Sequence, residues 1–306
     1  MSLLELDLSN RHLEYDPRQV WQLGNGVWTT FNSFEGSLGD IEIAAEDWLK
    51  QLNGVTCGWL VWNAHPEWCY AQQRMVDNLG WTPIVGGDPR LPKPPMIDSA
   101  VFVDFNRVLK LPYMGPMFPV EFAFMWISKI CFFHSDLLLT DKSLRSISNI
   151  FETLKKGGTC AVSTFRFGKF WKRAPRAWEL IGCTTAGASR NQFHFGAGWW
   201  CKISDHPNCP SDVERKKRAE LYWDHGAGVL YWKRKYGGNL TLIPLRKVAY
   251  GHFSPASKKQ QYKRLSNDDK GRILKQQLDA NISLESACQE LGLDYEYLID
   301  GFSRHG

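Results

Sequence analysis

The sequence of 306 residues has no long uninterrupted apolar run. Its longest mostly apolar stretch, residues 118–127, contains Glu121, so we expect no membrane-spanning segment. Residues 1–10 lack a basic start followed by an apolar stretch, and we therefore expect no secretion signal. The composition, with 43% hydrophobic and 23% charged residues, predicts a folded protein with a sizeable core.

Cysteines are few and scattered, and no two of the eight form a CxxC pair. This pattern is not typical of a disulfide framework, and it favours reduced thiols in an intracellular protein, located in a cytoplasm, a nucleus or an infected host cell. A zinc site can be drawn from Cys201, His206 and Cys209, although their spacing matches no common zinc pattern.

Charge is unevenly distributed along the chain, although the net charge is only +5. Residues 151–264 hold 22 basic and 7 acidic side chains, a net charge of +15, whereas residues 1–100 hold 6 and 13. A basic block of this size is typical of surfaces that meet phosphates, either of a nucleotide or of a nucleic acid, and equally of solvated helix faces. Aromatic residues interleave with the basic ones and offer faces on which a base can stack.

Hydrophobic periodicity in the first half of the chain predicts alternating strands and helices. This alternation favours an α/β fold of the Rossmann type, with a mostly parallel sheet flanked by helices and sites beyond the carboxyl ends of the strands. The strands are expected at residues 26–34, 57–62, 81–85, 100–105, 130–139, 159–163, 196–203 and 240–244. The helices are expected at residues 41–52, 66–79 and 119–129.

The segment CFFHSDLLLTDKSLRSI, residues 131–147, is the first that indicates chemistry. On a strand, His134 and Asp136 point to the same side, where the apolar run ends near a site mouth. The pair can hold a divalent cation, or it can be a polar strand end without a ligand.

This pattern resembles the GT-A class of nucleotide-sugar-dependent glycosyltransferases, in which a DxD motif ends a strand and its last Asp binds a metal ion. Here the motif reads His134, Ser135, Asp136, with a histidine at the first acidic position. Three later segments agree with the resemblance in order and spacing: QFHFGAGWWCKISDH at 192–206 as the acceptor-side strand, YWDHGAGVLYW at 222–232 as an acidic helix start, and AYGHFS at 249–254. The resemblance covers residues 26–255.

The resemblance implies that Asp136 and His252, with His134, bind Mn²⁺ or Mg²⁺ on the diphosphate of a nucleotide sugar. It also implies that Asp224 lies beside the sugar, as a general base or as a group that grips sugar hydroxyls. An Asp at a helix start is equally an ordinary N-cap. The donor, with uridine diphosphate glucose as the expected one, is placed on the first βα turn, around Thr29, Asn32 and Asp104.

The carboxyl-terminal residues 265–306 predict a small helical module, separate from a catalytic domain at residues 1–255. Helices are expected at residues 266–280, 283–291 and 294–302, with a sharp turn at Gly292. The last two resemble a helix-turn-helix unit. Because the second helix carries Asp294, Glu296 and Asp300, it is a poor reader of a phosphate-lined groove, and a protein-contacting cap is the alternative.

The expected activity is therefore transfer of a sugar to a hydroxyl acceptor, with a hydroxymethylated pyrimidine base in DNA as its most specific form. That form resembles the DNA glycosyltransferases of phages and of base J synthesis. A base brought out of the stack favours aromatic partners, here Trp171, Trp199 or Trp200, beside the basic Lys172 and Arg173. The alternatives are a glycan or protein acceptor, a nucleotidyltransferase, and a non-catalytic DNA-binding protein. The oligomeric state stays open.

Overall fold

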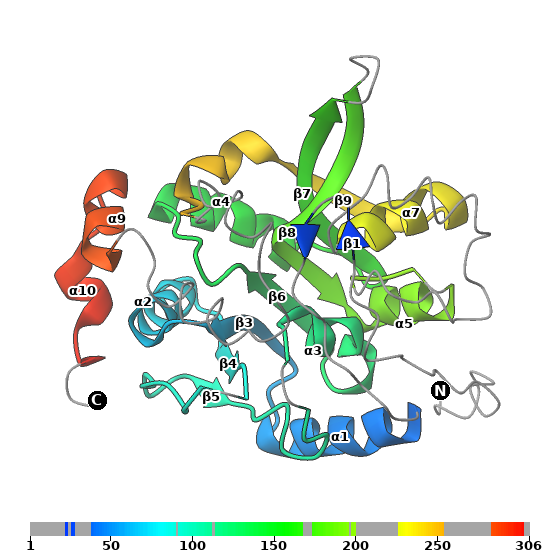
Figure 1. Ribbon diagram of the computed structural model, residues 1–306, viewed down its shortest axis with the longest axis horizontal. Helices are drawn as coiled ribbons and strands as arrows, with labels where there is room; N and C mark the ends of the chain where they lie inside the picture. Colours follow the sequence, from blue (N-terminus) through cyan, green and yellow to red (C-terminus); the bar gives the residue numbers. More distant parts are fainter. Residues whose placement is uncertain are drawn as a thin grey trace.

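The computed structural model describes residues 22–23, 26–27, 38–89, 91–111, 114–167, 173–195, 197–199, 226–253 and 283–302. Within them lies a seven-stranded sheet in the order β5-β4-β3-β6-β8-β7-β9 (Figure 1). Strand β8 runs antiparallel to both of its neighbours, and the other pairs are parallel. The strands are β3 (Cys57–Asn63), β4 (Pro83–Gly87), β5 (Val101–Phe102), β6 (Lys129–Phe133), β7 (Gly158–Phe167), β8 (Arg173–Thr185) and β9 (Asn239–Pro244).

Helices cover both faces of this sheet, which confirms the predicted α/β layering. One face packs against α1 (Leu38–Gln51), α3 (Met117–Glu121), the 3-10 turn η2 (Ala123–Met125), α5 (Ala186–His194) and α7 (Gly226–Tyr236). The other face packs against α2 (Pro66–Asp77), α4 (Asp141–Glu152), α9 (Leu284–Leu291) and α10 (Tyr295–Ile299). Two further 3-10 turns, η3 (Leu245–Lys247) and η4 (Ala249–Gly251), follow β9.

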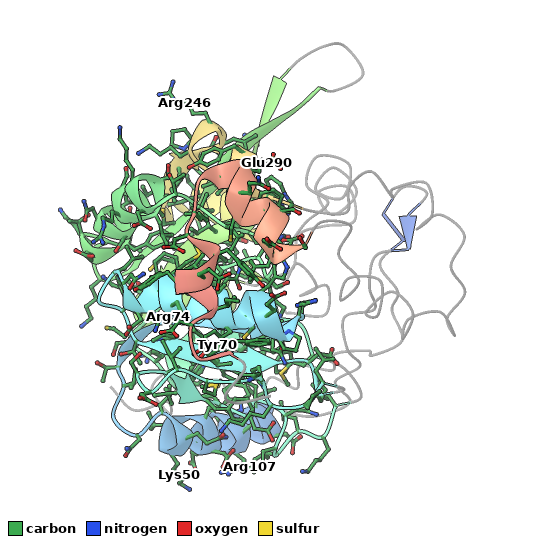
Figure 2. All side chains as sticks on the ribbon, turned by 90° about the vertical axis from the view of Figure 1, so that its left-hand side faces the viewer. Lys50, Tyr70, Arg74, Arg107, Arg246 and Glu290 are labelled. Atoms are coloured by element: carbon green, nitrogen blue, oxygen red, sulfur yellow. The ribbon has the colours of Figure 1, made fainter. Side chains whose placement is uncertain are left out.

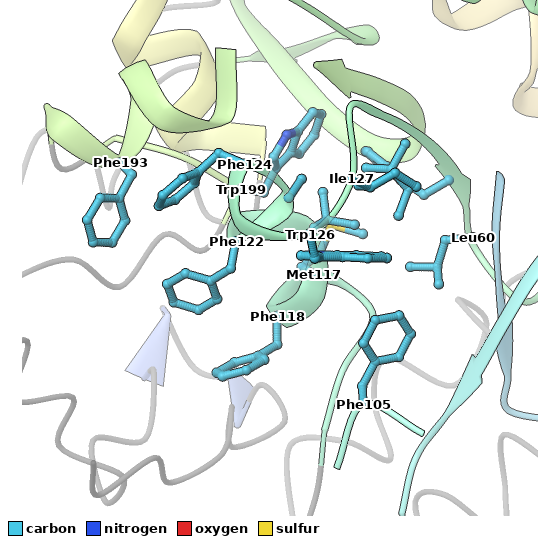
Figure 3. Close-up of a cluster of buried hydrophobic side chains, with 14 of the residues drawn as sticks. Leu60, Phe105, Met117, Phe118, Phe122, Phe124, Trp126, Ile127, Phe193 and Trp199 are labelled. Carbon is cyan, nitrogen blue, oxygen red and sulfur yellow. The ribbon is translucent and has the colours of Figure 1, made fainter. Parts of the chain in front are cut away.

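The strand sequences explain the two layers, because successive side chains enter opposite cores. In β3, Leu60 and Trp62 belong to the first core, whereas Trp59 and Val61 belong to the second. The first core is rich in aromatic rings, and Figure 3 shows several of them between α3 and the sheet. The indole N–H of Trp48, one of several fully buried tryptophans, donates there to the carbonyl of Phe105 (3.0 Å).

The predicted β-α-β order is confirmed between β3 and β4, and the boundary of one expected strand needs correction. The strand expected at residues 26–34 is described only as β2 (Gly26–Val27), which pairs with β1 (Gln22–Leu23) outside the main sheet. The strand expected at residues 130–139 ends at Phe133. The chain then turns, because the amide of Leu137 donates to the carbonyl of His134 (3.1 Å).

Three elements were not predicted or were assigned the wrong type. Strand β8 was missed because its start, Arg-Ala-Pro-Arg-Ala, has no alternation of apolar residues. Helix α4 was missed, although its Thr140–Asp141 start is a common helix opening. Residues 192–194, expected as the beginning of a strand, are the last turn of α5, and residues 197–199 form no strand.

The two carboxyl-terminal helices that the structure describes occur where the sequence predicts them; α10 packs against α2, and α9 packs against α10 (Figure 2). Ser283 and Asp294 cap them, and Gly292 turns between them with a φ of 65°. Leu284, Ala287, Cys288 and Leu298 join the second core of the sheet. Arg74 of α2 lies over the ring of Tyr297 (4.6 Å). The helix expected at residues 266–280 lies outside the described residues.

No described helix is long and apolar enough to span a membrane. The described cysteines are all free thiols. Burial raises the pKa of the Cys160 thiol, so it stays protonated in the sheet.

Candidate metal centre

Three side chains converge at the carboxyl edge of the sheet, at the end of β6. Nδ1 of His134 lies 3.7 Å from Oδ1 of Asp136, and Nε2 of His252 lies 3.4 Å from the same oxygen. One ligand atom from each residue lies within 4.8 Å of the other two. The expected convergence of Asp136 and His252, which are 116 positions apart in the chain, is therefore confirmed.

The first two residues are placed by the turn that follows β6. Gln72, a fully buried residue of α2, donates both amide hydrogens to main-chain oxygens, one to His134 (2.8 Å) and one to Leu137 (2.9 Å). The side chain of Gln72 therefore fixes the two ends of this turn. A turn held in this way, and not the expected two-residue alternation of a strand, brings His134 and Asp136 to the same place.

The third residue is delivered by a backbone contact between η4 and the same turn. His252 forms a β-bridge with Leu137, and the amide of Phe253 donates to the carbonyl of Asp136 (3.0 Å). The amide of Leu138 donates to the carbonyl of Gly251 (2.9 Å). A Cβ at Gly251 would lie 1.7 Å from the carbonyl oxygen of Leu138, so only glycine permits this approach.

The electrostatics of the cluster favour a bound cation. Burial by itself raises the pKa of Asp136, but its contact with His252 and the charges of His252 and His134 outweigh burial and hold that pKa below its usual range. Oδ1 of Asp136 and Nε2 of His252 are buried, and neither makes a hydrogen bond. The side chain of Asp136 is nevertheless 31% exposed, so solvent and ligands reach the carboxylate.

The ligand types and spacing fit a divalent metal ion. Two ligands at about 2.1 Å from one cation and at right angles are about 3 Å apart, close to the separations seen here. Imidazole and carboxylate donors suit Mn²⁺, and a largely hydrated Mg²⁺ also fits. The buried atoms without hydrogen bonds, Oδ1 of Asp136 and Nε2 of His252, are the ones a cation would satisfy.

Two residues of β8 complete the surroundings. The ring of Trp178 lies edge-on to both imidazoles, with its centroid 5.1 Å from that of His252 and 6.3 Å from that of His134. Glu179 places Oε1 3.7 Å from Nε2 of His134. Sequence reasoning missed the role of Glu179, and likewise that of Gln72, because strand pairing and helix packing across long chain separations bring them here.

The structure leaves several predicted site residues undescribed. Thr29, Asn32, Asp224, Trp171, Lys172 and Trp200 lie outside the described residues, as do Cys201, His206 and Cys209. Arg173 begins β8, and its side chain is not described. Helix α7 begins at Gly226, which agrees with the helix start predicted beside Asp224.

Two residues that were expected to contact a ligand, Trp199 and Asp104, have contacts that explain their positions without one. Trp199 is fully buried, and its ring meets that of Phe132 edge-on (4.8 Å), so it belongs to the core and no face is open to a base. Asp104 lies in an exposed turn after β5, where its Oδ1 accepts the amide of Asn106 (3.0 Å). This contact is typical of an ordinary turn at the end of a strand and needs no ligand.

The position of the cluster in the topology is informative. From β3 the chain continues to β4 on one side, and β6 returns on the other side of β3. The two strands that diverge in this way are β3 and β6, and His134 directly follows β6. In open α/β sheets, ligands bind beyond the carboxyl ends of the strands at such a switch point.

In comparisons with known proteins, no family model, curated protein or solved structure matches the chain.

Proposed function

We propose that this chain is a metal-dependent glycosyltransferase that moves a sugar from a nucleoside diphosphate sugar to a hydroxyl acceptor. The observation that carries the proposal is the cluster of His134, Asp136 and His252 beside the switch point of the sheet. A cation site at this place lies where the phosphates of a nucleotide are bound in α/β proteins. The GT-A resemblance in the sequence names the same three residues.

The sheet itself supports the same class. Counted from β3 as the first strand, its order is 3-2-1-4-6-5-7, and the sixth strand is antiparallel to its neighbours. The first four positions have the order of a nucleotide-binding half-sheet. The first βα turn of this sheet follows β3 at Asn63 and is a further candidate for binding the nucleotide, whereas Thr29 and Asn32 lie outside the described residues and stay predictions.

The residues of the cluster have separable roles in the proposed reaction. Asp136 and His252 would hold the cation, which would supply positive charge against the negative charge of a departing diphosphate. Trp178 packs against His252 and bounds one side of the cluster. Asp224 remains the predicted carboxylate on the sugar side, and its role awaits a direct test.

The acceptor proposed is a hydroxymethylated pyrimidine base in DNA, and the β7–β8 ribbon supports it. Within the part of the chain that the structure describes, residues 164–167 and 173–176 pair only with each other, because β9 ends opposite Ser163 and β6 ends opposite Ile181. Figure 1 shows this ribbon projecting from the sheet. Residues 164–176 contain five basic side chains, four aromatic ones and no acidic one. A two-stranded ribbon fits the major groove, and its charge complements phosphates.

The donor is tested by thermal unfolding with a panel of nucleotide sugars, with and without Mn²⁺. A ligand at about 100 times its Kd adds about 2.7 kcal/mol, which raises the Tm by roughly 5–10 °C. We expect this shift with uridine diphosphate glucose plus Mn²⁺, and its loss in Asp136→Ala and His252→Ala. Asp77→Ala, an exposed carboxylate at the far end of α2, is the matched control and keeps the shift. A shift unaffected by either cluster variant contradicts the assignment.

The reaction is tested by the mass of the product on hydroxymethylated DNA and on unmodified DNA. Transfer adds one hexose to the modified base only and releases a nucleoside diphosphate. Release of inorganic diphosphate indicates a nucleotidyltransferase instead, and transfer to glycans or proteins alone removes the DNA acceptor.

The ribbon is tested by the salt dependence of duplex binding. Each lost phosphate contact lowers the slope of log K against log salt by about 0.9, so Arg166→Gln with Arg176→Gln lowers it by about 2. Lys155→Gln with Lys156→Gln removes the same charge before the start of β7, at the other end of the strand, and leaves the slope unchanged. Equal slopes for both double variants contradict a role for the ribbon.

A further inference from the structure

We propose that Glu179 positions His134 by accepting the hydrogen of Nε2, so that Nδ1 is the nitrogen that faces the cation. This inference rests on the metal centre of the proposed function, and it does not depend on the donor or the acceptor. Glu179 is thus a positioning residue, which acts through His134 without touching the ion.

The two nitrogens of His134 face two different carboxylates. Nδ1 lies 3.7 Å from Oδ1 of Asp136, on the side of the cluster that holds His252. Nε2 lies 3.7 Å from Oε1 of Glu179, on β8. A neutral imidazole carries one hydrogen, and it can present a lone pair to a cation only on the other nitrogen. With the hydrogen on Nε2 directed at Glu179, the lone pair of Nδ1 is directed toward Asp136 and His252.

Glu179 reaches His134 because β8 is irregular where it passes the metal centre. On β7, the single residue Ala161 lies opposite residues 179–182 of β8. On its other side, β8 remains paired with β6, and the amide of His134 donates to the carbonyl of Leu180 (2.9 Å). Bulges re-aim side chains and are frequent beside active sites.

The effect of the bulge is visible in two consecutive residues. Neighbours on a regular strand point to opposite faces. Trp178 and Glu179 nevertheless both approach His134, the first by its ring and the second by its carboxylate. Gly182 completes the bulge, because a Cβ there would lie 2.7 Å from the carbonyl oxygen of Cys160. The strand therefore departs from its regular path at the point where it supplies two contacts to one histidine.

The burial of Glu179 makes its contact with His134 energetically important. The residue is only 7% exposed, and a buried carboxylate is unfavourable unless it is paired. A histidine that binds a metal usually donates its second ring hydrogen to a carboxylate or carbonyl, which fixes the ring and makes the ligating nitrogen more basic. Loss of such an outer partner typically weakens metal affinity by about 10- to 100-fold.

The tautomer is measured directly by long-range proton–nitrogen correlation spectra of the protein loaded with diamagnetic Mg²⁺ and labelled in its histidines, at alkaline pH. His134→Asn identifies the signal. We expect the Nε2–H tautomer in the parent, and a shift toward the Nδ1–H tautomer in Glu179→Ala. In Glu179→Gln the amide oxygen still accepts the hydrogen, so the parent tautomer returns. A parent imidazole in the Nδ1–H form overturns the proposal.

Affinity for Mn²⁺ alone is measured in parallel from the electron paramagnetic resonance signal of the free ion. We expect Glu179→Ala to weaken binding by about 10- to 100-fold and Glu179→Gln by less. Glu121→Gln, an equally buried carboxylate in the other core, is the matched control and keeps the parent affinity. Both Glu179 variants binding within twofold of the parent overturns the proposal.

Asp136→Ala separates this inference from the metal centre itself. If Asp136→Ala loses Mn²⁺ while the Glu179 variants keep it, Glu179 has no positioning role and the centre stands. If the parent binds no Mn²⁺, both fail.

Discussion

Replacing Gly251 by alanine tests the backbone contact that delivers His252. The added Cβ would lie 1.7 Å from the carbonyl oxygen of Leu138, well inside the 3.0 Å below which real Cβ atoms are essentially never found. One of the two segments must therefore move by more than about 1 Å, and both are main chain, which cannot swing aside as a side chain can.

The expected cost combines two terms. Overpacking costs about 1–3 kcal/mol, and the loss of the hydrogen bond from Leu138 to Gly251 costs about 1 kcal/mol more. We therefore expect Gly251→Ala to lower the free energy of unfolding by about 2–4 kcal/mol. Because His252 is the next residue, its imidazole moves away from Asp136, and we expect Mn²⁺ affinity to fall by at least about tenfold, the lower end of the effect of a lost outer partner.

Both quantities are measured on one preparation, by urea unfolding and by titration of Mn²⁺. Gly187→Ala is the control, because this helical glycine has nothing closer than 3.4 Å to a new Cβ. Alanine there improves helix propensity by up to about 1 kcal/mol and leaves metal binding unchanged. A Gly251→Ala protein as stable as the parent and with the parent's Mn²⁺ affinity refutes the reasoning.

Three further predictions concern the same site and its surroundings. Burial lowers the pKa of His134, but Glu179 and Asp136 outweigh burial and raise that pKa above its usual value. Protonated His134 therefore stabilises the metal-free protein below a pH of about 6.5, and this stabilisation is lost as the pH rises through the raised pKa. Metal binding needs neutral imidazole, so the Tm increase caused by Mn²⁺ grows with pH over that window, and melts at several pH values with and without Mn²⁺ check both signs. Gln72→Leu removes the side-chain donor of two carbonyls, of which that of His134 keeps the amide of Leu137; we expect it to cost about 1–3 kcal/mol in urea unfolding and to weaken Mn²⁺ binding. Gln73→Leu, equally buried but donating to the carbonyl of Pro95, costs stability alone. Trp199→Ala costs about 3–5 kcal/mol as a core truncation, and its folded fraction binds duplex DNA like the parent; a stable variant with reduced DNA affinity contradicts its placement in the core.

Local pattern was sufficient to predict the first part of the sheet. The apolar residues of β3 form a short continuous run, those of α2 recur at helical spacing, and Pro66 marks the helix start. Residues 57–77 could therefore be assigned from sequence alone. Strand β8 could not, because its pairing with β6 and β7 is a long-range property and its first five residues carry no alternation.

The identity of the three residues in the candidate site could be predicted from the order of the motifs along the sequence. The resemblance paired Asp136 with His252, and the structure brings them together. Geometry within the site was not predictable, because a turn held by Gln72 replaces the expected strand, and a bulge in β8 directs Glu179 to His134. The donor contact assigned to Asp104 stays a prediction, because the turn that holds this residue is explained by its bond to Asn106 without a ligand.

Anomalous diffraction at the manganese absorption edge tests the metal centre most directly, with crystals grown in Mn²⁺ and uridine diphosphate. The structure predicts a peak within coordination distance of His134, Asp136 and His252, with the diphosphate on its open side. A nucleotide bound beyond the ends of β3 and β6 with no manganese peak among these three side chains, or a peak at another place, contradicts it.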